Sequence, residues 1–225
     1  MTSTALVVGG FGALGSAISS ALSADSFDVL RSSRSPRPES PEAVVITDSM
    51  PGDLPPLSAV VWAQGINVND SVSTFADDDL ARLLEVNVVS VASQLRALVS
   101  RGTLQDGARV VVVSSIWEQL ARPGKFSYTV TKAAVGGLVR AAALDLAPRG
   151  ILVNGVLPGV VDTPMSRAML SADQIEAFEQ STGAGRMVAP QDVAAVVAHL
   201  ASARNTAVTG QSVAVDLGFT VGRIL

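Results

Sequence analysis

The chain has 225 residues, of which 48% are hydrophobic and 16% charged. This composition fits one globular domain with a sizeable core and excludes a disordered or low-complexity chain. The absence of cysteine excludes disulfides, thiol catalysis and cysteine-ligated metals, and a single histidine excludes a multi-histidine metal site. A serine triad would have to use His199, so acid/base chemistry falls to carboxylates, lysines or the single tyrosine, Tyr128.

The formal net charge is −4, and no basic run is longer than the spaced arginines between Arg31 and Arg37. We therefore expect no nucleic-acid partner. The N-terminus lacks the basic start and apolar core of a signal peptide, and we expect no apolar stretch of the roughly 18 residues that a membrane helix needs. These features favour a cytoplasmic protein without a membrane segment.

Short β-branched runs alternate with stretches rich in alanine and leucine, which predicts parallel strands joined by crossover helices. The predicted strands are Ala5–Val8, Phe27–Arg31, Val44–Thr47, Ala59–Ala63, Arg109–Ser114, Ile151–Leu157 and Ser212–Asp216. The predicted helices are Gly12–Leu22, Asp77–Ser100, Ser127–Ala147, Ala172–Gln180 and Pro190–Ser202.

Two connections are too rich in proline for a full crossover helix, Ser32–Ala43 and Asp48–Ser58. The expected fold is a single α/β domain with a Rossmann-like, doubly wound parallel sheet of about seven strands. Its first half, to about residue 110, would hold a cofactor, and residues 111–225 would supply catalysis and substrate binding.

A glycine-rich turn follows the first predicted strand. Gly10, Gly12 and Gly15 match the dinucleotide pattern G-x-G-x-x-G, and Gly9, Gly12 and Gly15 form a second series with a spacing of three. Glycines let backbone N–H groups approach a pyrophosphate, which the helix N-terminus also attracts. The position between a strand and a helix favours a nucleotide site over a tight turn without a ligand.

The end of the second strand should contact the adenosine ribose. A carboxylate there is typical of NAD binding, whereas this chain has Arg31, Ser32, Ser33 and Arg34, with no acid before Glu39. We therefore predict NADP(H), with Arg34 as the better phosphate partner because Arg31 should still lie in the strand. Ordinary solvated arginines are the alternative.

Tyr128 and Lys132 are four residues apart on a predicted helix, so they share one face. A nearby ammonium favours a phenolate and would lower the pKa of Tyr128 from its usual value near 10. Ser114 and Ser115 end a buried strand, where ligands gather in open α/β sheets. A tyrosine and a lysine at this spacing also occur without function, because lysine is common on helices.

Together these residues resemble the short-chain dehydrogenase/reductase family over nearly the whole chain. Its Y-x-x-x-K motif matches Tyr128 and Lys132, its catalytic serine matches Ser115, and its helix-four asparagine matches Asn87. The segment Pro158 to Thr163 matches the P-G-x-x-x-T motif that holds the nicotinamide.

The resemblance implies hydride transfer between NADP(H) and a carbonyl or secondary alcohol. In it Tyr128 would exchange the proton, Ser115 would orient the substrate oxygen, Lys132 would hold the ribose, and Asn87 would position a water. The cofactor contacts that it implies, together with the glycine turn and the ribose-reading residues, are Gly9, Phe11, Gly12, Leu14, Gly15, Ser33, Arg34, Asp48, Ala63, Gly65, Asn87, Tyr128, Lys132, Pro158, Gly159, Val161 and Thr163.

Two segments depart from the family pattern. The threonine before the glycine turn is Val8 and the middle glycine is Ala13, although Gly12 lies beside it. The N-N-A-G element reads Trp62-Ala63-Gln64-Gly65, which keeps only its glycine and loses the asparagine support. Cofactor binding should differ in detail at these points.

The stretch Pro164 to Val188 has the composition of a mobile cover over a substrate pocket, to which Met165, Met169 and Met187 would add apolar contacts. Trp117 and Glu118 are candidate pocket walls, and an acid there would disfavour anionic substrates. His199 should be structural. Alternatives to a carbonyl reductase or alcohol dehydrogenase are a non-catalytic NADP-binding regulator and a related epimerase or dehydratase. A homodimer or homotetramer is expected.

Overall fold

The computed structural model of the protein describes residues 3–47 and 50–222. Seven parallel strands form one sheet in the order β3-β2-β1-β4-β5-β6-β7, which confirms the expected Rossmann-like fold. The strands are β1 (Ser3–Val8), β2 (Phe27–Ser33), β3 (Val44–Val45), β4 (Leu57–Trp62), β5 (Leu104–Val113), β6 (Leu152–Pro158) and β7 (Ser212–Val215).

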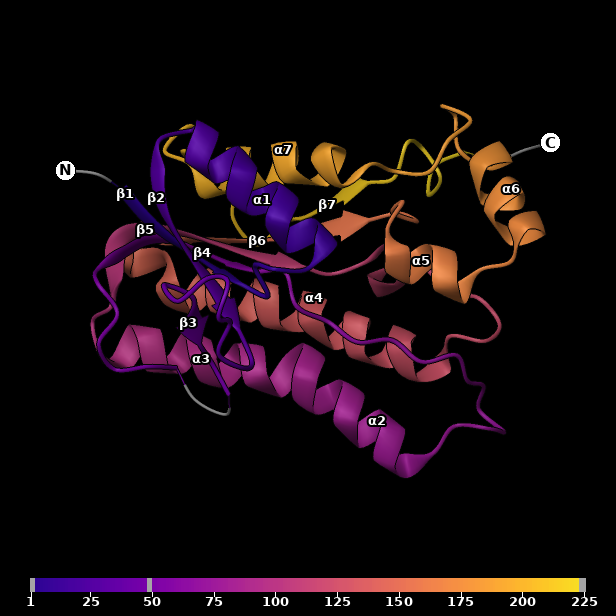
Figure 1. Ribbon diagram of the computed structural model, residues 1–225, viewed down its shortest axis with the longest axis horizontal. Helices are drawn as coiled ribbons and strands as arrows, with labels where there is room; N and C mark the ends of the chain where they lie inside the picture. The colour runs from indigo at the N-terminus through magenta and orange to yellow at the C-terminus, as the bar shows by residue number, and fades with distance from the viewer. Residues whose placement is uncertain (1–2, 48–49, 223–225) are drawn as a thin grey trace.

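Helices cover both faces of the sheet (Figure 1). α1 (Ala13–Ala24) packs against α7 (Pro190–Ala201) on one face, and α2 (Asp77–Leu84), α3 (Ser90–Ser100) and α4 (Phe126–Leu146) cover the other. Two helices near the carboxyl ends of the strands are α5 (Pro164–Met169), which the sequence analysis did not predict, and α6 (Ala172–Gln180). Short 3-10 turns span Ile116–Glu118 and Ala147–Arg149.

The central strands alternate their side chains between two cores. Leu6 and Val60 belong to the cluster under α3 and α4, whereas Val7 and Val61 belong to the cluster under α1 and α7. All four are fully buried. Burial on both faces explains why these strands are almost entirely apolar in sequence.

The predicted helix Asp77–Ser100 is a continuous 24-residue run, but a π-helical turn at Glu85–Val89 divides it into α2 and α3. By length and composition alone, this run could cross a membrane. The expectation that no apolar stretch is as long as a membrane helix is therefore wrong. The run's apolar side chains, Val91, Leu95 and Leu98, are part of the core under α3 and α4. Packing against the sheet therefore accounts for part of the apolar character of this run.

Two shortened connections leave β3 as a two-residue edge strand. Between β2 and β4 the described residues form no helix, as the proline content predicted. Because the strand order reverses between β1 and β4, the connections that follow these two strands leave in opposite directions, and a crevice forms outside their carboxyl ends.

Candidate active site

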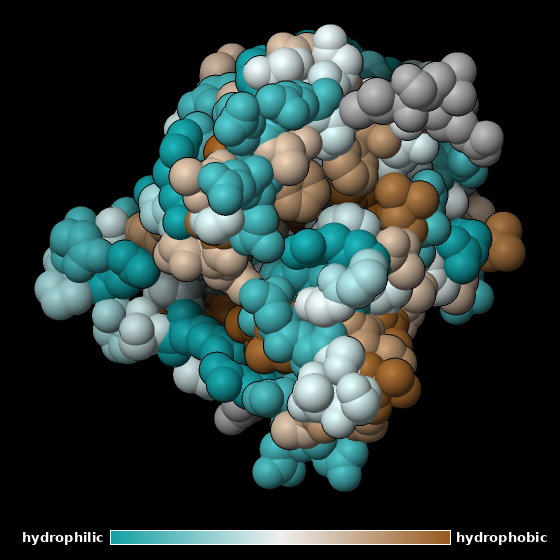
Figure 2. Space-filling view, turned by 90° about the vertical axis from the view of Figure 1, so that its right-hand side faces the viewer, coloured by the Kyte–Doolittle hydropathy of each residue, from teal (hydrophilic) through white to brown (hydrophobic). Residues whose placement is uncertain are grey.

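A cavity of about 620 Å³ lies at the carboxyl ends of the central strands. Its wall runs from the glycine turn after β1 to α5 and α6. On the face that carries α5 and α6, Figure 2 shows a recess with hydrophobic side chains in its depth and hydrophilic ones around it. The volume is that of a typical ligand site.

The glycine turn brings backbone to the cavity. Gly9 has a φ of +78°, and a Cβ on Gly15 would lie 2.1 Å from the Gly9 carbonyl oxygen, so a side chain at either position would disrupt the turn. Gly12 begins α1 without a side-chain cap, and the first turn of the helix has no acidic residue. Gly12, Ala13 and Leu14 line the cavity, so the positive end of α1 is available to a phosphate.

Arg31 lies in β2, as expected, and braces this turn from outside. Its Nε donates to the Gly10 carbonyl at 3.0 Å, its Nη2 donates to Ser16 Oγ at 3.2 Å, and its guanidinium lies 3.9 Å from the centre of the Phe11 ring. Phe11, a candidate cofactor contact, does not line the cavity. These contacts of Arg31 with the glycine turn and with Phe11 were not predicted from the sequence.

Most of the candidate cofactor residues line one continuous wall of the cavity. Gly15 does not, because it packs α1 against the turn, and Asp48 lies outside the described residues. The candidates on the wall are Gly9, Gly12, Leu14, Ser33, Arg34, Ala63, Gly65, Tyr128, Lys132, Pro158, Gly159, Val161 and Thr163.

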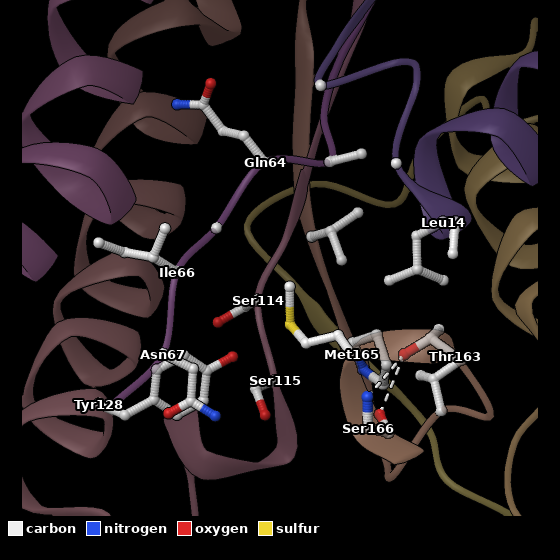
Figure 3. A pocket seen from close by; sticks show the side chains of 18 of the residues that line it. Leu14, Gln64, Ile66, Asn67, Ser114, Ser115, Tyr128, Thr163, Met165 and Ser166 are labelled. Carbon is white, nitrogen blue, oxygen red and sulfur yellow. Dashed lines mark hydrogen bonds between the residues drawn. The ribbon is translucent and has the colours of Figure 1, made fainter. Parts of the chain in front are cut away.

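Tyr128, Ser115 and Lys132 meet on this cavity. Tyr128 and Lys132 come from successive turns of α4, and the ammonium nitrogen lies 5.5 Å from the ring centre. Ser115 begins the 3-10 turn after β5, where its Oγ accepts a hydrogen bond from Trp117 N at 3.3 Å. Figure 3 shows Tyr128 and Asn67 on one side, Thr163, Met165 and Ser166 on the other, and the two serines between them.

The electrostatics of this group differ from the expectation for Tyr128. Burial raises the pKa of Tyr128 to about 12, and a hydrogen bond with Ser115 only partly opposes that rise. Lys132 is 3% exposed, and burial lowers its pKa to about 8. For the protein groups on their own the pKa of Tyr128 is therefore raised and not lowered as expected, because desolvation of the phenolate outweighs the hydrogen bond with Ser115.

Asn87 lies in the π-helical turn, behind the cavity wall. Its amide donates to the Ile66 carbonyl at 3.0 Å and to Thr131 Oγ1 at 3.2 Å, and its Oδ1 accepts from Ile66 N at 2.9 Å. It therefore ties the segment after β4 to α4. Its side-chain oxygen would lie 3.5 Å from a Cβ on Gly65.

Gln64, which stands within the element that departs from the family pattern, binds the π-helical turn through its side chain. Gln64 Nε2 donates to the Val86 carbonyl, in the π-helical turn, at 3.2 Å and to Ser90 Oγ at 2.7 Å. Ser90 Oγ donates to the same carbonyl at 2.8 Å. The segment after β4 is thus held at two points, Gln64 and Ile66.

Glu118 is not a pocket wall, so that expectation is wrong. Its Oε1 accepts a hydrogen bond from Ser212 Oγ at 2.6 Å, on β7. A Cβ on Gly136 would lie 2.5 Å from the same oxygen, so this glycine of α4 makes room for the carboxylate. The 3-10 turn points Trp117 toward the cavity and Glu118 behind it.

The sequence analysis also missed two cations on the cavity wall, Arg122 and Lys125, in the loop before α4. Of the expected methionines, Met165 and Met169 line the cavity, whereas Met187 is buried away from it. His199 is exposed on α7, outside the cavity.

The profile of a family described as Enoyl-(Acyl carrier protein) reductase matches residues 45–220. Cyclopentanol dehydrogenase of Comamonas sp. (strain NCIMB 9872) is 36% identical over 165 residues, 73% of this chain and 66% of the relative, just under two thirds of its length. The 3-oxoacyl-[acyl-carrier-protein] reductase of Vibrio cholerae is 30% identical over 183 residues, 80% of this chain and 73% of the relative.

A solved short chain dehydrogenase family protein from Francisella tularensis shares the fold with a TM-score of 0.88 and 24% identity, covering 99% of this chain and 100% of that one. Together with the sheet order, the glycine turn and the residues on the cavity wall, these matches place the chain in the short-chain dehydrogenase/reductase family of oxidoreductases.

Proposed function

We propose that the protein transfers hydride reversibly between NADP(H) and a carbonyl or secondary alcohol, with Tyr128 as the general acid and base. The observation that carries this proposal is the meeting of Tyr128, Ser115 and Lys132 on the cavity that also contains the glycine turn. Relatives whose names denote an alcohol dehydrogenase and an oxoacyl reductase support the same reaction class.

The residues of the first half fit a dinucleotide. The uncapped N-terminus of α1 suits a pyrophosphate, and Gly9 and Gly65 keep the wall free of side chains. Ser33 and Arg34 line the same end of the cavity, where a guanidinium suits the 2′-phosphate that distinguishes NADP from NAD. When bound, the nicotinamide supplies or accepts the hydride.

The side chains of Tyr128, Lys132 and Ser115 carry out the proton transfer. With a pKa of about 12, Tyr128 is protonated at neutral pH and can donate a proton to a carbonyl oxygen during reduction. Lys132, with a pKa of about 8, is largely an ammonium at neutral pH and stabilises negative charge that develops on the phenol oxygen. Ser115 orients the substrate oxygen toward Tyr128.

The test is a panel of ketones and oxoacyl thioesters, assayed with NADPH and NADH in parallel by loss of reduced-nicotinamide absorbance. Turnover with a preference for NADPH is the expected result. Tight NADP binding without turnover of any carbonyl would instead support a regulator. Equal rates with both cofactors would overturn the role of Arg34.

The proposal includes a cytoplasmic homodimer or homotetramer, in line with the expectation from the family resemblance. Sedimentation equilibrium of the purified protein tests the assembly state, and a purely monomeric species at the concentrations used for activity assays would contradict it.

A further inference from the structure

The substrate end of the cavity is positively charged. Its wall carries Arg122 and Lys125, in addition to Lys132 beside Tyr128 and Arg34 at the opposite, cofactor end. Among the residues that the structure describes, no aspartate or glutamate lines this cavity. Glu118, which would have disfavoured an anion, is bound to Ser212 behind the wall.

Lys125 is 5% exposed, yet it lines the cavity. Within the described ranges, its ammonium has neither a hydrogen bond nor an ion-pair partner within 4.0 Å. The nitrogen lies 5.6 Å from the centre of the Tyr128 ring. The side chain is almost entirely buried while it reaches the cavity, so a ligand anion at this point would gain a strong interaction with the ammonium.

Arg122 lies on the same side, between two aromatic residues of the wall. Its guanidinium carbon is 5.6 Å from the Trp117 ring centre and 5.7 Å from that of Phe178 on α6. Its Nε is buried without a hydrogen-bond partner among the described residues. The rings thus hold the guanidinium on the cavity wall, where its other N–H donors suit a planar carboxylate.

Asp70 is the acid that acts on Lys125, but it does not occupy the site. Its Oδ1 accepts from Ser127 N at 2.9 Å, at the start of α4, and its carbonyl accepts from Phe126 N at 3.2 Å. It raises the pKa of Lys125, whereas burial and Arg122 lower it, with a net value of about 8. The cavity side of Lys125 stays open to a ligand.

We propose that the substrate is an oxo acid, whose carboxylate binds Lys125 and Arg122 while its carbonyl oxygen meets Tyr128 and Ser115. This inference rests on the proposed hydride transfer. The short distance from Lys125 to the Tyr128 ring places the carboxylate within a few atoms of the carbonyl. Trp117, Met165, Leu170 and Phe178 on the wall suit an apolar chain.

The test compares short oxo acids that carry apolar chains with their methyl esters, each assayed with NADPH. The wild type should prefer the acid in kcat/KM, and Lys125→Met or Arg122→Gln should lower the acid-to-ester ratio by about tenfold to a hundredfold, the loss expected for a hydrogen-bonded charge pair. Arg140→Gln is the matched control, because Arg140 is an exposed cation on α4, the helix that follows their loop, and lies outside the cavity. It should leave the ratio unchanged.

Calorimetry with hexanoate and hexanamide separates anion binding from catalysis. Hexanoate should bind the wild type more tightly than the amide, and Lys125→Met should remove the difference. Esters turned over as fast as acids, with no preference for hexanoate, would overturn the inference and leave the hydride transfer intact. A preference for hexanoate without turnover of any carbonyl would overturn the proposed function, and with it the oxo acid as substrate, but would leave the carboxylate site at Lys125 and Arg122.

Discussion

The Lys132 ammonium lies 5.5 Å from the centre of the Tyr128 ring and donates a hydrogen bond to the Val113 carbonyl at 3.3 Å. The lysine is thus tied to the end of β5 while it faces the tyrosine from one helical turn along α4. Burial acts on both groups in the direction that disfavours charge, raising the pKa of Tyr128 and lowering that of Lys132.

The ionisation of Tyr128 can be observed directly, because it is the only tyrosine in the chain. Its pKa of about 12 means that the folded protein should show no tyrosinate absorbance in the near ultraviolet at pH about 10, where an exposed tyrosine is half ionised. Protein unfolded in guanidinium should titrate near 10. Half-ionisation of the folded protein at that pH would contradict the effect of burial.

Replacing Glu118 should change the pH dependence through Lys132. The Glu118 carboxylate is the group that raises the pKa of Lys132 against burial, so Glu118→Gln should lower that pKa below about 8. Because lysine is charged below its pKa, the ammonium is then lost at lower pH. The limb of the kcat/KM profile that depends on Lys132 should move to lower pH.

Ser212→Ala is the matched control for this effect. It removes the 2.6 Å hydrogen bond to Glu118 but keeps the charge, so the profile should stay in place. Equal shifts in both variants would show that packing, rather than charge, links Glu118 to Lys132.

Arg34→Gln should weaken NADPH binding and leave NADH nearly unaffected. Loss of a charge-assisted phosphate contact predicts a rise of about tenfold to a hundredfold in the KM for NADPH. Arg37→Gln is the control, because Arg37 pairs with Glu39 at 2.9 Å and does not line the cavity. A parallel loss with both cofactors would point to damage of the fold.

Asn87→Ala should lower the stability of the protein as well as the rate of the reaction. The change leaves both backbone groups of Ile66 without the partners that they have at 2.9 and 3.0 Å. A fully buried group left without a partner costs about 1–3 kcal/mol of unfolding free energy, and the partly buried groups of Ile66 should lose less than that. Urea unfolding measures the loss, with Val89→Ala as control, because Val89 is 45% exposed in the same π-helical turn. Equal stability of the two variants would refute the bridging role of Asn87.

The parts of the fold that follow a regular period could be predicted from sequence. The apolar run from Val110 to Val113 is typical of a strand that is buried on both faces. The four-residue spacing of Tyr128 and Lys132 on a helix places both side chains on the same cavity. The proline content of the two connections likewise predicted the lack of a helix among the described residues between β2 and β4.

Other features of the site depend on the direction in which a side chain points, which the sequence does not show. Glu118 follows Trp117 in the chain, yet the 3-10 turn sends the two side chains to opposite sides of the wall. The cationic wall comes from a loop, where no period predicts which side chains turn inward. The pKa of Tyr128 depends on burial by segments distant in the chain, and only the folded structure shows that burial exceeds the effect of the hydrogen bond with Ser115.

The most direct test of the account is the single-turnover rate of hydride transfer in Tyr128→Phe, measured with bound NADPH and a carbonyl that the wild type reduces. The ring still fills the cluster with Ile116, Trp117 and Leu157, so the fold and the affinity for NADPH should be kept. If Tyr128 is the general acid, the variant's rate should be about 10²- to 10⁴-fold below that of the wild type, the usual contribution of general acid catalysis. A variant that reduces the carbonyl at the wild-type rate would contradict the assignment of Tyr128 as the proton donor.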